Sequence, residues 1–129
     1  MKNVIETDFV SIRSSHSLGT LVSHIATAKR NIFPVVGKGG GLVGIVLLDD
    51  VRKVMFQSDL YDKLSVSDFM CAPIAIIDIT DSMEVVTEKF EKSKAWNLPV
   101  IQDGKYIGFV SKSRIFEAYR DVLKHQSED

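Results

Sequence analysis

Hydrophobic and polar residues follow one order twice along this chain of 129 residues. In the first half, alternation over residues 9–13 predicts a short strand, and apolar residues spaced three and four apart over 18–28 predict an amphipathic helix. Two apolar runs within 32–48 flank a glycine-rich turn and predict a hairpin. Asp49 and Asp50 then open a second helix, where carboxylates suit the positive end of the helix dipole.

The second half repeats this order. Residues 74–79 predict a strand, and Asp81 with Glu84 resembles a capping box at the start of a helix. Residues 98–111 predict a second hairpin, and apolar residues from Ile115 onward line a last helix. Each half is therefore expected to be a β-α-β-β-α unit.

The hairpins carry the clearest repetition. The segments before and after the first turn, Phe33-Pro34-Val35-Val36 and Leu42-Val43-Gly44-Ile45-Val46, return as Leu98-Pro99-Val100-Ile101 and Tyr106-Ile107-Gly108-Phe109-Val110. Helices on one side of each sheet leave its other face uncovered. We expect an α/β fold with repeats over residues 1–62 and 63–129, packed through their sheets about a pseudo-twofold axis, with a ligand cleft between them.

Composition narrows the classes of partner. The formal charge of −1 gives no general attraction to nucleic acid, so no nucleic-acid partner is expected. No apolar run approaches the roughly 18–20 residues of a membrane span, so this fragment is expected to be soluble. The single cysteine, Cys71, cannot form an internal disulfide and is expected to be a buried or half-buried bystander.

Catalytic patterns are not legible in the sequence. No histidine pair or His/Cys/carboxylate cluster has metal-ligand spacing, so no metal site is expected. No context orders a serine, histidine and aspartate into a triad. The chain is therefore expected not to be an enzyme and to have no catalytic residues.

The segments that end each hairpin, Gly44–Asp50 and Gly108–Arg114, resemble a family pattern. The repeat is similar to a pair of CBS domains (a Bateman module), in which an h-P-V strand is followed by G-h-V-[ST]-x-x-[DN]. In that family the hydroxyl and the acid hold an adenosine ligand, and the backbone before the h-P-V proline reads the adenine. The resemblance implies ATP, ADP or AMP as the ligand of this chain.

Each copy keeps half of the family's polar pair. The first has Asp50 but Leu47 in place of the hydroxyl, and the second has Ser111 but Arg114 in place of the acid. The loss of one or two of these hydrogen bonds weakens binding about tenfold to a few hundredfold, although Arg114 could approach a phosphate. The resemblance implies a site of these residues: Asp50, Ser111, Arg114, Ile32, Phe33, Asn97 and Leu98. The alternative is a structural or dimerising pair, in which Asp50 and Ser111 only serve their helix ends.

A narrower resemblance links the chain to the CBS pair of bacterial CLC-type chloride channels and transporters. It is carried by residues 30–35, 44–56, 95–100 and 108–116. It implies a regulatory homodimer on the cytoplasmic face of the membrane, attached to the transmembrane chloride-channel part of the same polypeptide. A free-standing nucleotide-sensing CBS protein and a regulatory insert of a metabolic enzyme are the alternatives.

Overall fold

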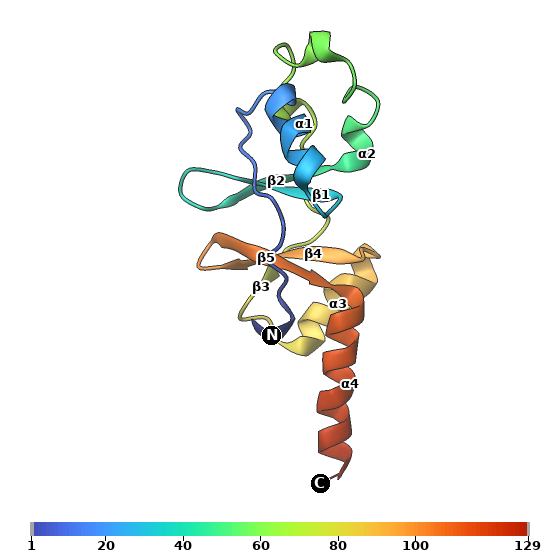
Figure 1. Ribbon diagram of the computed structural model, residues 1–129. Coiled ribbons are helices and arrows are strands. Elements are labelled where there is room, and N and C mark those ends of the chain that lie inside the picture. Colours follow the sequence, from blue (N-terminus) through green and yellow to red (C-terminus); the bar gives the residue numbers. More distant parts are fainter. Residues whose placement is uncertain (1, 129) are drawn as a thin grey trace. The chain divides into compact units, whose positions relative to one another are not determined.

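The chain forms two compact units whose segments interleave along the sequence. The computed structural model describes residues 2–128 (Figure 1). The first-repeat unit consists of Asp8–Pro73 and Gly104–Tyr106, and the second-repeat unit consists of Met1–Thr7, Ile74–Asp103 and Ile107–Asp129. Residues 2–7 thus lie in the unit built mainly from the second repeat. The repeat boundary between residues 62 and 63 stays a prediction.

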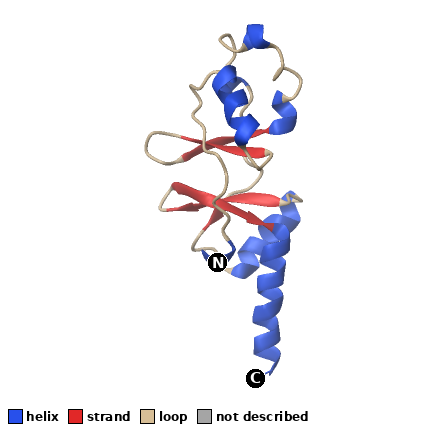
Figure 2. Ribbon diagram, in the orientation of Figure 1, coloured by secondary structure: helices blue, strands red, loops and turns tan. Residues whose placement is uncertain are grey.

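In the first-repeat unit, a hairpin carries its helices on one side (Figure 2). Its elements are α1 (Leu18–Thr27), β1 (Ile32–Val36), β2 (Leu42–Leu47), α2 (Leu48–Val51) and the 3-10 turns η2 (Ser58–Leu60) and η3 (Val66–Asp68). Strands β1 and β2 are antiparallel, with Pro34 opposite Ile45. The core gathers apolar residues of both strands and of the helices, among them Leu21, Phe33 and Val46.

The strand predicted over residues 9–13 is wrong in extent. Only Ile12 pairs with the sheet: its N–H donates to the carbonyl of Pro34 at 2.9 Å, and its carbonyl accepts the N–H of Val36 at 2.9 Å. Asp8 and Phe9 instead meet the side chain of Arg30. The alternation of apolar and polar residues over 9–13 therefore reflects side-chain contacts of this segment as much as backbone pairing.

The second-repeat unit has a three-stranded sheet in the order β3-β4-β5. Its elements are η1 (Lys2–Val4), β3 (Ile77–Asp78), α3 (Met83–Ser93), β4 (Asn97–Gln102), β5 (Lys105–Ser111) and α4 (Lys112–Glu128). The first residues of β5 belong to the first-repeat unit. Strand β3 is parallel to β4 and shorter than the predicted 74–79. The core of the second-repeat unit contains Val86, Phe90 and Val110.

The start of α3 corrects the predicted cap. The residue that caps α3 is Ser82, whose Oγ accepts the N–H of Val85 at 3.2 Å. Asp81 accepts the N–H of Asp78 at 3.0 Å and binds the ammonium of Lys89 at 2.7 Å. Asp81 therefore closes the preceding loop, because its carboxylate is one residue too early to reach the helix.

Candidate functional site

In each unit a helix begins directly after the second strand of the hairpin. Its first residue lies beside the residue that precedes the first strand of that hairpin. The N–H of Leu48, the first residue of α2, donates to the carbonyl of Asn31 at 2.9 Å. The N–H of Lys112, the first residue of α4, donates to the carbonyl of Trp96 at 2.8 Å. This equivalent bond brings the predicted site residues of each unit to one end of its hairpin.

The first-repeat unit places Ile32, Phe33 and Asp50 at its strand-to-helix junction. Ile32 lies opposite Leu47 in the hairpin, and the side chain of Phe33 is 1% exposed in the core. Phe33 as a whole is therefore buried, and it lies opposite Val46 in the hairpin. Asp50 is exposed in the short helix α2, one residue after Asp49, which pairs with an arginine of the next turn.

The second-repeat unit places Asn97, Leu98, Ser111 and Arg114 at the equivalent junction. Leu98 is buried, while Asn97 and Ser111 are half-buried. The Oγ of Ser111 accepts the N–H of Arg114 at 3.3 Å, so Ser111 serves the first turn of α4. The Arg114 side chain is half-exposed, and its Nε lies 3.4 Å from Oε1 of Glu6.

Sequence reasoning missed Lys112 and Glu6 at this junction. The Lys112 ammonium lies 5.4 Å from the ring centre of Trp96, which is 74% exposed, and 5.9 Å from that of Phe116. Comparing the repeats position by position would have revealed Lys112, because it takes the place of Leu48. Glu6 gave no such signal, since it is far from Arg114 in the sequence.

The place equivalent to Trp96 has a different neighbourhood in the first-repeat unit. Beside Asn31, the Arg30 guanidinium donates to both carboxylate oxygens of Asp8, at 2.9 and 3.1 Å. It also lies 4.7 Å from the centre of the Phe9 ring. The hydrogen bond from Arg30 holds the pKa of Asp8 below its ordinary value. Arg30 is therefore already engaged within its own unit.

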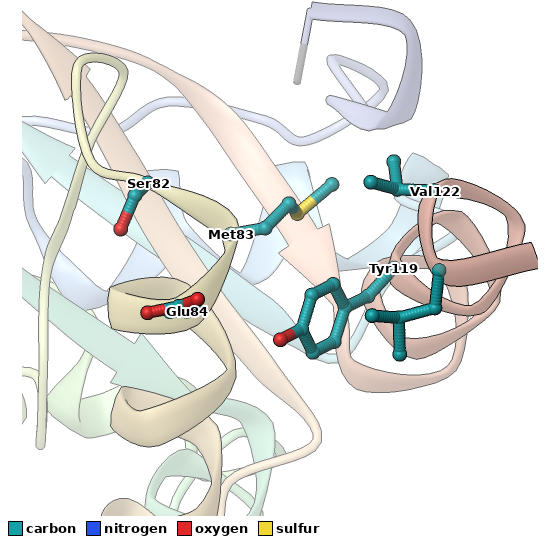
Figure 3. A pocket seen from close by; sticks show the side chains of 6 residues that line it. Ser82, Met83, Glu84, Tyr119 and Val122 are labelled. Carbon is teal, nitrogen blue, oxygen red and sulfur yellow. The ribbon is translucent and has the colours of Figure 1, made fainter. Parts of the chain in front are cut away.

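A separate groove lies between α3 and α4 (Figure 3). It has a volume of about 370 Å³ and is lined by Ser82, Met83, Glu84, Tyr119, Val122 and Leu123. The Ser82 hydroxyl already caps α3. The charged side chain among these lining residues is the carboxylate of Glu84, which repels a phosphate.

Two further properties bear on the kind of site. None of the helices within residues 2–128 combines the length and the apolar character that crossing a bilayer requires. Among the same residues, no group of three or more His, Cys, Asp or Glu side chains is arranged to hold a metal ion. Cys71 is exposed, contrary to expectation, because backbone bonds to Ile45 hold it at the edge of β2.

The chain belongs to the CBS domain family, whose model matches residues 1–57 and 66–121. A curated relative, homoserine O-acetyltransferase of Methanococcus vannielii, is 24% identical over 116 residues. That match covers 89% of this chain but only 24% of the relative, so the chain spans about a quarter of the relative's length.

Solved structures share the fold at low identity. The CBS domain of a bacterial CNNM/CorC family Mg²⁺ transporter in complex with ATP has a TM-score of 0.75 and 14% identity, covering 90% of this chain and 83% of that one. CbpB in complex with c-di-AMP has a TM-score of 0.74 and 16% identity, covering 99% and 89%. The mixed α/β architecture of a tandem CBS pair is thus confirmed.

Proposed function

We propose that this chain is a non-catalytic regulatory module that binds an adenine nucleotide at the second-repeat unit, where β5 meets α4. The observation that carries the proposal is the difference in charge between the equivalent strand-to-helix junctions of the two units. Four residues read Leu47-Leu48-Asp49-Asp50 in one unit and Ser111-Lys112-Ser113-Arg114 in the other. The first set is apolar and acidic, whereas the second is hydroxylic and cationic. An anionic ligand is attracted only to the second.

The neighbouring groups suit the two ends of a nucleotide. Lys112 and Arg114 place two positive charges in the first turn of α4, which contains no acidic residue, and the positive end of the helix dipole adds to them. The largely exposed ring of Trp96 offers a flat surface on which a base can stack. Asn97, half-buried at the start of β4 beside the buried Leu98, provides polar groups for the edge of the base.

The same comparison argues against the first-repeat unit. Asp50 would accept a hydrogen bond from a ribose hydroxyl, but Asp49 beside it repels phosphate. Ile32 is half-buried and Phe33 is buried, so neither offers a charged group, and the nearby Arg30 is held by Asp8. We therefore propose one nucleotide per chain. The proteins of similar fold named with ATP and c-di-AMP support adenine as the base.

The test uses the single tryptophan, Trp96, as reporter together with calorimetry. Titration with ATP, ADP, AMP and c-di-AMP is expected to change the fluorescence of Trp96 and to give one site per chain, with adenosine binding more weakly than ATP. Arg120→Ala, which removes a positive charge farther along α4, is the control for nonspecific charge. No heat with any nucleotide at millimolar concentration would overturn the proposal.

We also propose that the module is the cytoplasmic regulatory domain of a CLC-type chloride channel or transporter and acts as a homodimer. The resemblance of residues 30–35, 44–56, 95–100 and 108–116 to CLC-type proteins supports chloride as the transported ion. The structural similarity to the CBS domain of a Mg²⁺ transporter supports a role in transport. The acetyltransferase relative favours a second candidate, a module attached to a metabolic enzyme. The coding sequence that flanks this chain distinguishes the two, and sedimentation equilibrium tests the homodimer.

A further inference from the structure

The N-terminal segment of the chain contacts the proposed nucleotide site directly. Glu6 pairs with Phe109 of β5 through two backbone hydrogen bonds, of 2.7 and 3.0 Å. The segment fits closely because Gly108 has no side chain: a Cβ there would lie 2.6 Å from the Glu6 carbonyl oxygen. Val4 and Ile5 pack against the core of the second-repeat unit.

The side chain of Glu6 reaches from this segment to Arg114. Its carboxylate is mostly buried, with the side chain 16% exposed, whereas the Arg114 side chain is 54% exposed. The contact joins Oε1 of Glu6 to Nε of Arg114, at 3.4 Å. One half-exposed cation therefore serves both the docked segment and the place where a phosphate is proposed to bind.

We infer that Glu6 competes with the nucleotide phosphate for Arg114, so that ligand binding loosens the N-terminal segment and the docked segment weakens ligand binding. This inference rests on the proposed function. A phosphate carries more charge than a carboxylate and takes the guanidinium more strongly. The Glu6 charge also repels the phosphate directly. Because coupling between two sites is reciprocal, both effects have the same size.

The first-repeat unit provides a built-in control. Cys71 pairs with Ile45 through the same two backbone hydrogen bonds, both 2.9 Å. Cys71 takes the place of Glu6, and Asp50 takes the place of Arg114, so that junction has no equivalent ion pair. Ligand binding is therefore expected to change the Glu6 segment and leave the Cys71 segment unchanged.

The test compares Glu6→Gln with Glu91→Gln, which removes an exposed carboxylate from α3. Calorimetry is expected to show ATP binding about two- to fivefold more tightly to E6Q than to the native chain, the size of a partly exposed ion pair, and unchanged binding to E91Q. In the native chain, ATP is expected to speed hydrogen exchange at the amide of Glu6 and not at that of Cys71.

Unchanged or weaker ATP binding to E6Q, or slower exchange at Glu6 with ATP, would overturn the inference while leaving the nucleotide site intact. If the native chain gives no heat with ATP, the proposed function fails first and the inference fails with it. The two failures are thus distinguishable in one set of titrations.

Discussion

The two units share their backbone framework and differ in their polar chemistry. Helix α1 is capped by Ser17 and α3 by Ser82, each through the N–H three residues on. The bonds from Leu48 and Lys112 to the start of the partner strand are also equivalent. The side chains at those junctions nevertheless carry opposite charge. The two repeats thus share the geometry of the scaffold and differ in the charge of the side chains at the strand-to-helix junctions.

The loops before α1 and α3 likewise share a backbone turn and differ in the side chains that close it. The N–H of Arg13 donates to Nδ1 of His16 at 3.2 Å, just as the N–H of Asp78 donates to the carboxylate of Asp81. Lys89 then pairs with Asp81, whereas His24 lies with its ring centre 6.0 Å from that of His16. One backbone turn is therefore closed by a carboxylate in one unit and by an imidazole in the other.

The largest expected difference concerns the paired glycines. A Cβ at Gly44 would lie 3.0 Å from the carbonyl oxygen of Cys71, but a Cβ at Gly108 would lie 2.6 Å from that of Glu6, and Gly108 has φ +154°. Gly108→Ala is expected to lower the free energy of unfolding by about 3 kcal/mol and Gly44→Ala by about 1 kcal/mol. Urea denaturation measures both, and equal losses would contradict the steric argument.

The next largest difference is expected in nucleotide affinity, which should respond to a change at the junction of the second-repeat unit more than to one at the junction of the first. Arg114→Ala removes a charged hydrogen bond to phosphate, worth about 1.5–3 kcal/mol, and is expected to weaken ATP binding about ten- to a hundredfold. Asp50→Ala, at the equivalent position, is expected to change it less than about twofold, the effect of a distant charge. Calorimetry with ATP tests both. A larger loss in D50A than in R114A would transfer the site to the first-repeat unit.

The helix caps are expected to respond alike. Ser17 and Ser82 each accept a backbone N–H, at 3.1 and 3.2 Å, and both residues are at least partly exposed. Ser17→Ala and Ser82→Ala should each lower the free energy of unfolding by about 1 kcal/mol. Thermal or urea unfolding of the two variants checks this. Threonine at each position serves as the matched control, because it keeps the hydroxyl. Losses that differ severalfold would show that the shared backbone hides unequal packing.

The hairpins and helices could be predicted because their apolar periodicity is local and occurs twice. The site was predicted only in part. Ser111 and Arg114 follow from the position of the hydroxyl and acid in the family pattern, but Glu6 reaches Arg114 from the N-terminal segment, far away in the sequence. Local patterns cannot show which strand edge such a segment joins. The limited strand pairing at Ile12 could not be predicted for the same reason, because its partner, Val35, is distant in the sequence.

The smallest expected effect compares how each unit holds an ionised aspartate. The pKa of Asp8 is lowered mainly by hydrogen bonds from Arg30, and that of Asp78 mainly by the backbone N–H and then the hydroxyl of Thr80. Since both values lie below the ordinary one, each carboxylate stabilises the fold at higher pH. That contribution is lost as pH falls below about 4.

Salt should distinguish these two aspartates. Salt weakens ion pairs between solvent-exposed side chains, so about 1 M NaCl is expected to weaken the partly exposed Arg30–Asp8 pair and to raise the pKa of Asp8 toward its ordinary value. The pKa of Asp78 should move less, because its first two partners are uncharged groups of Thr80. Carboxyl-carbon NMR titrations at low and high salt measure both, with Asp8→Asn assigning the resonance. Equal salt shifts would mean that Lys89, not Thr80, sets the ionisation of Asp78.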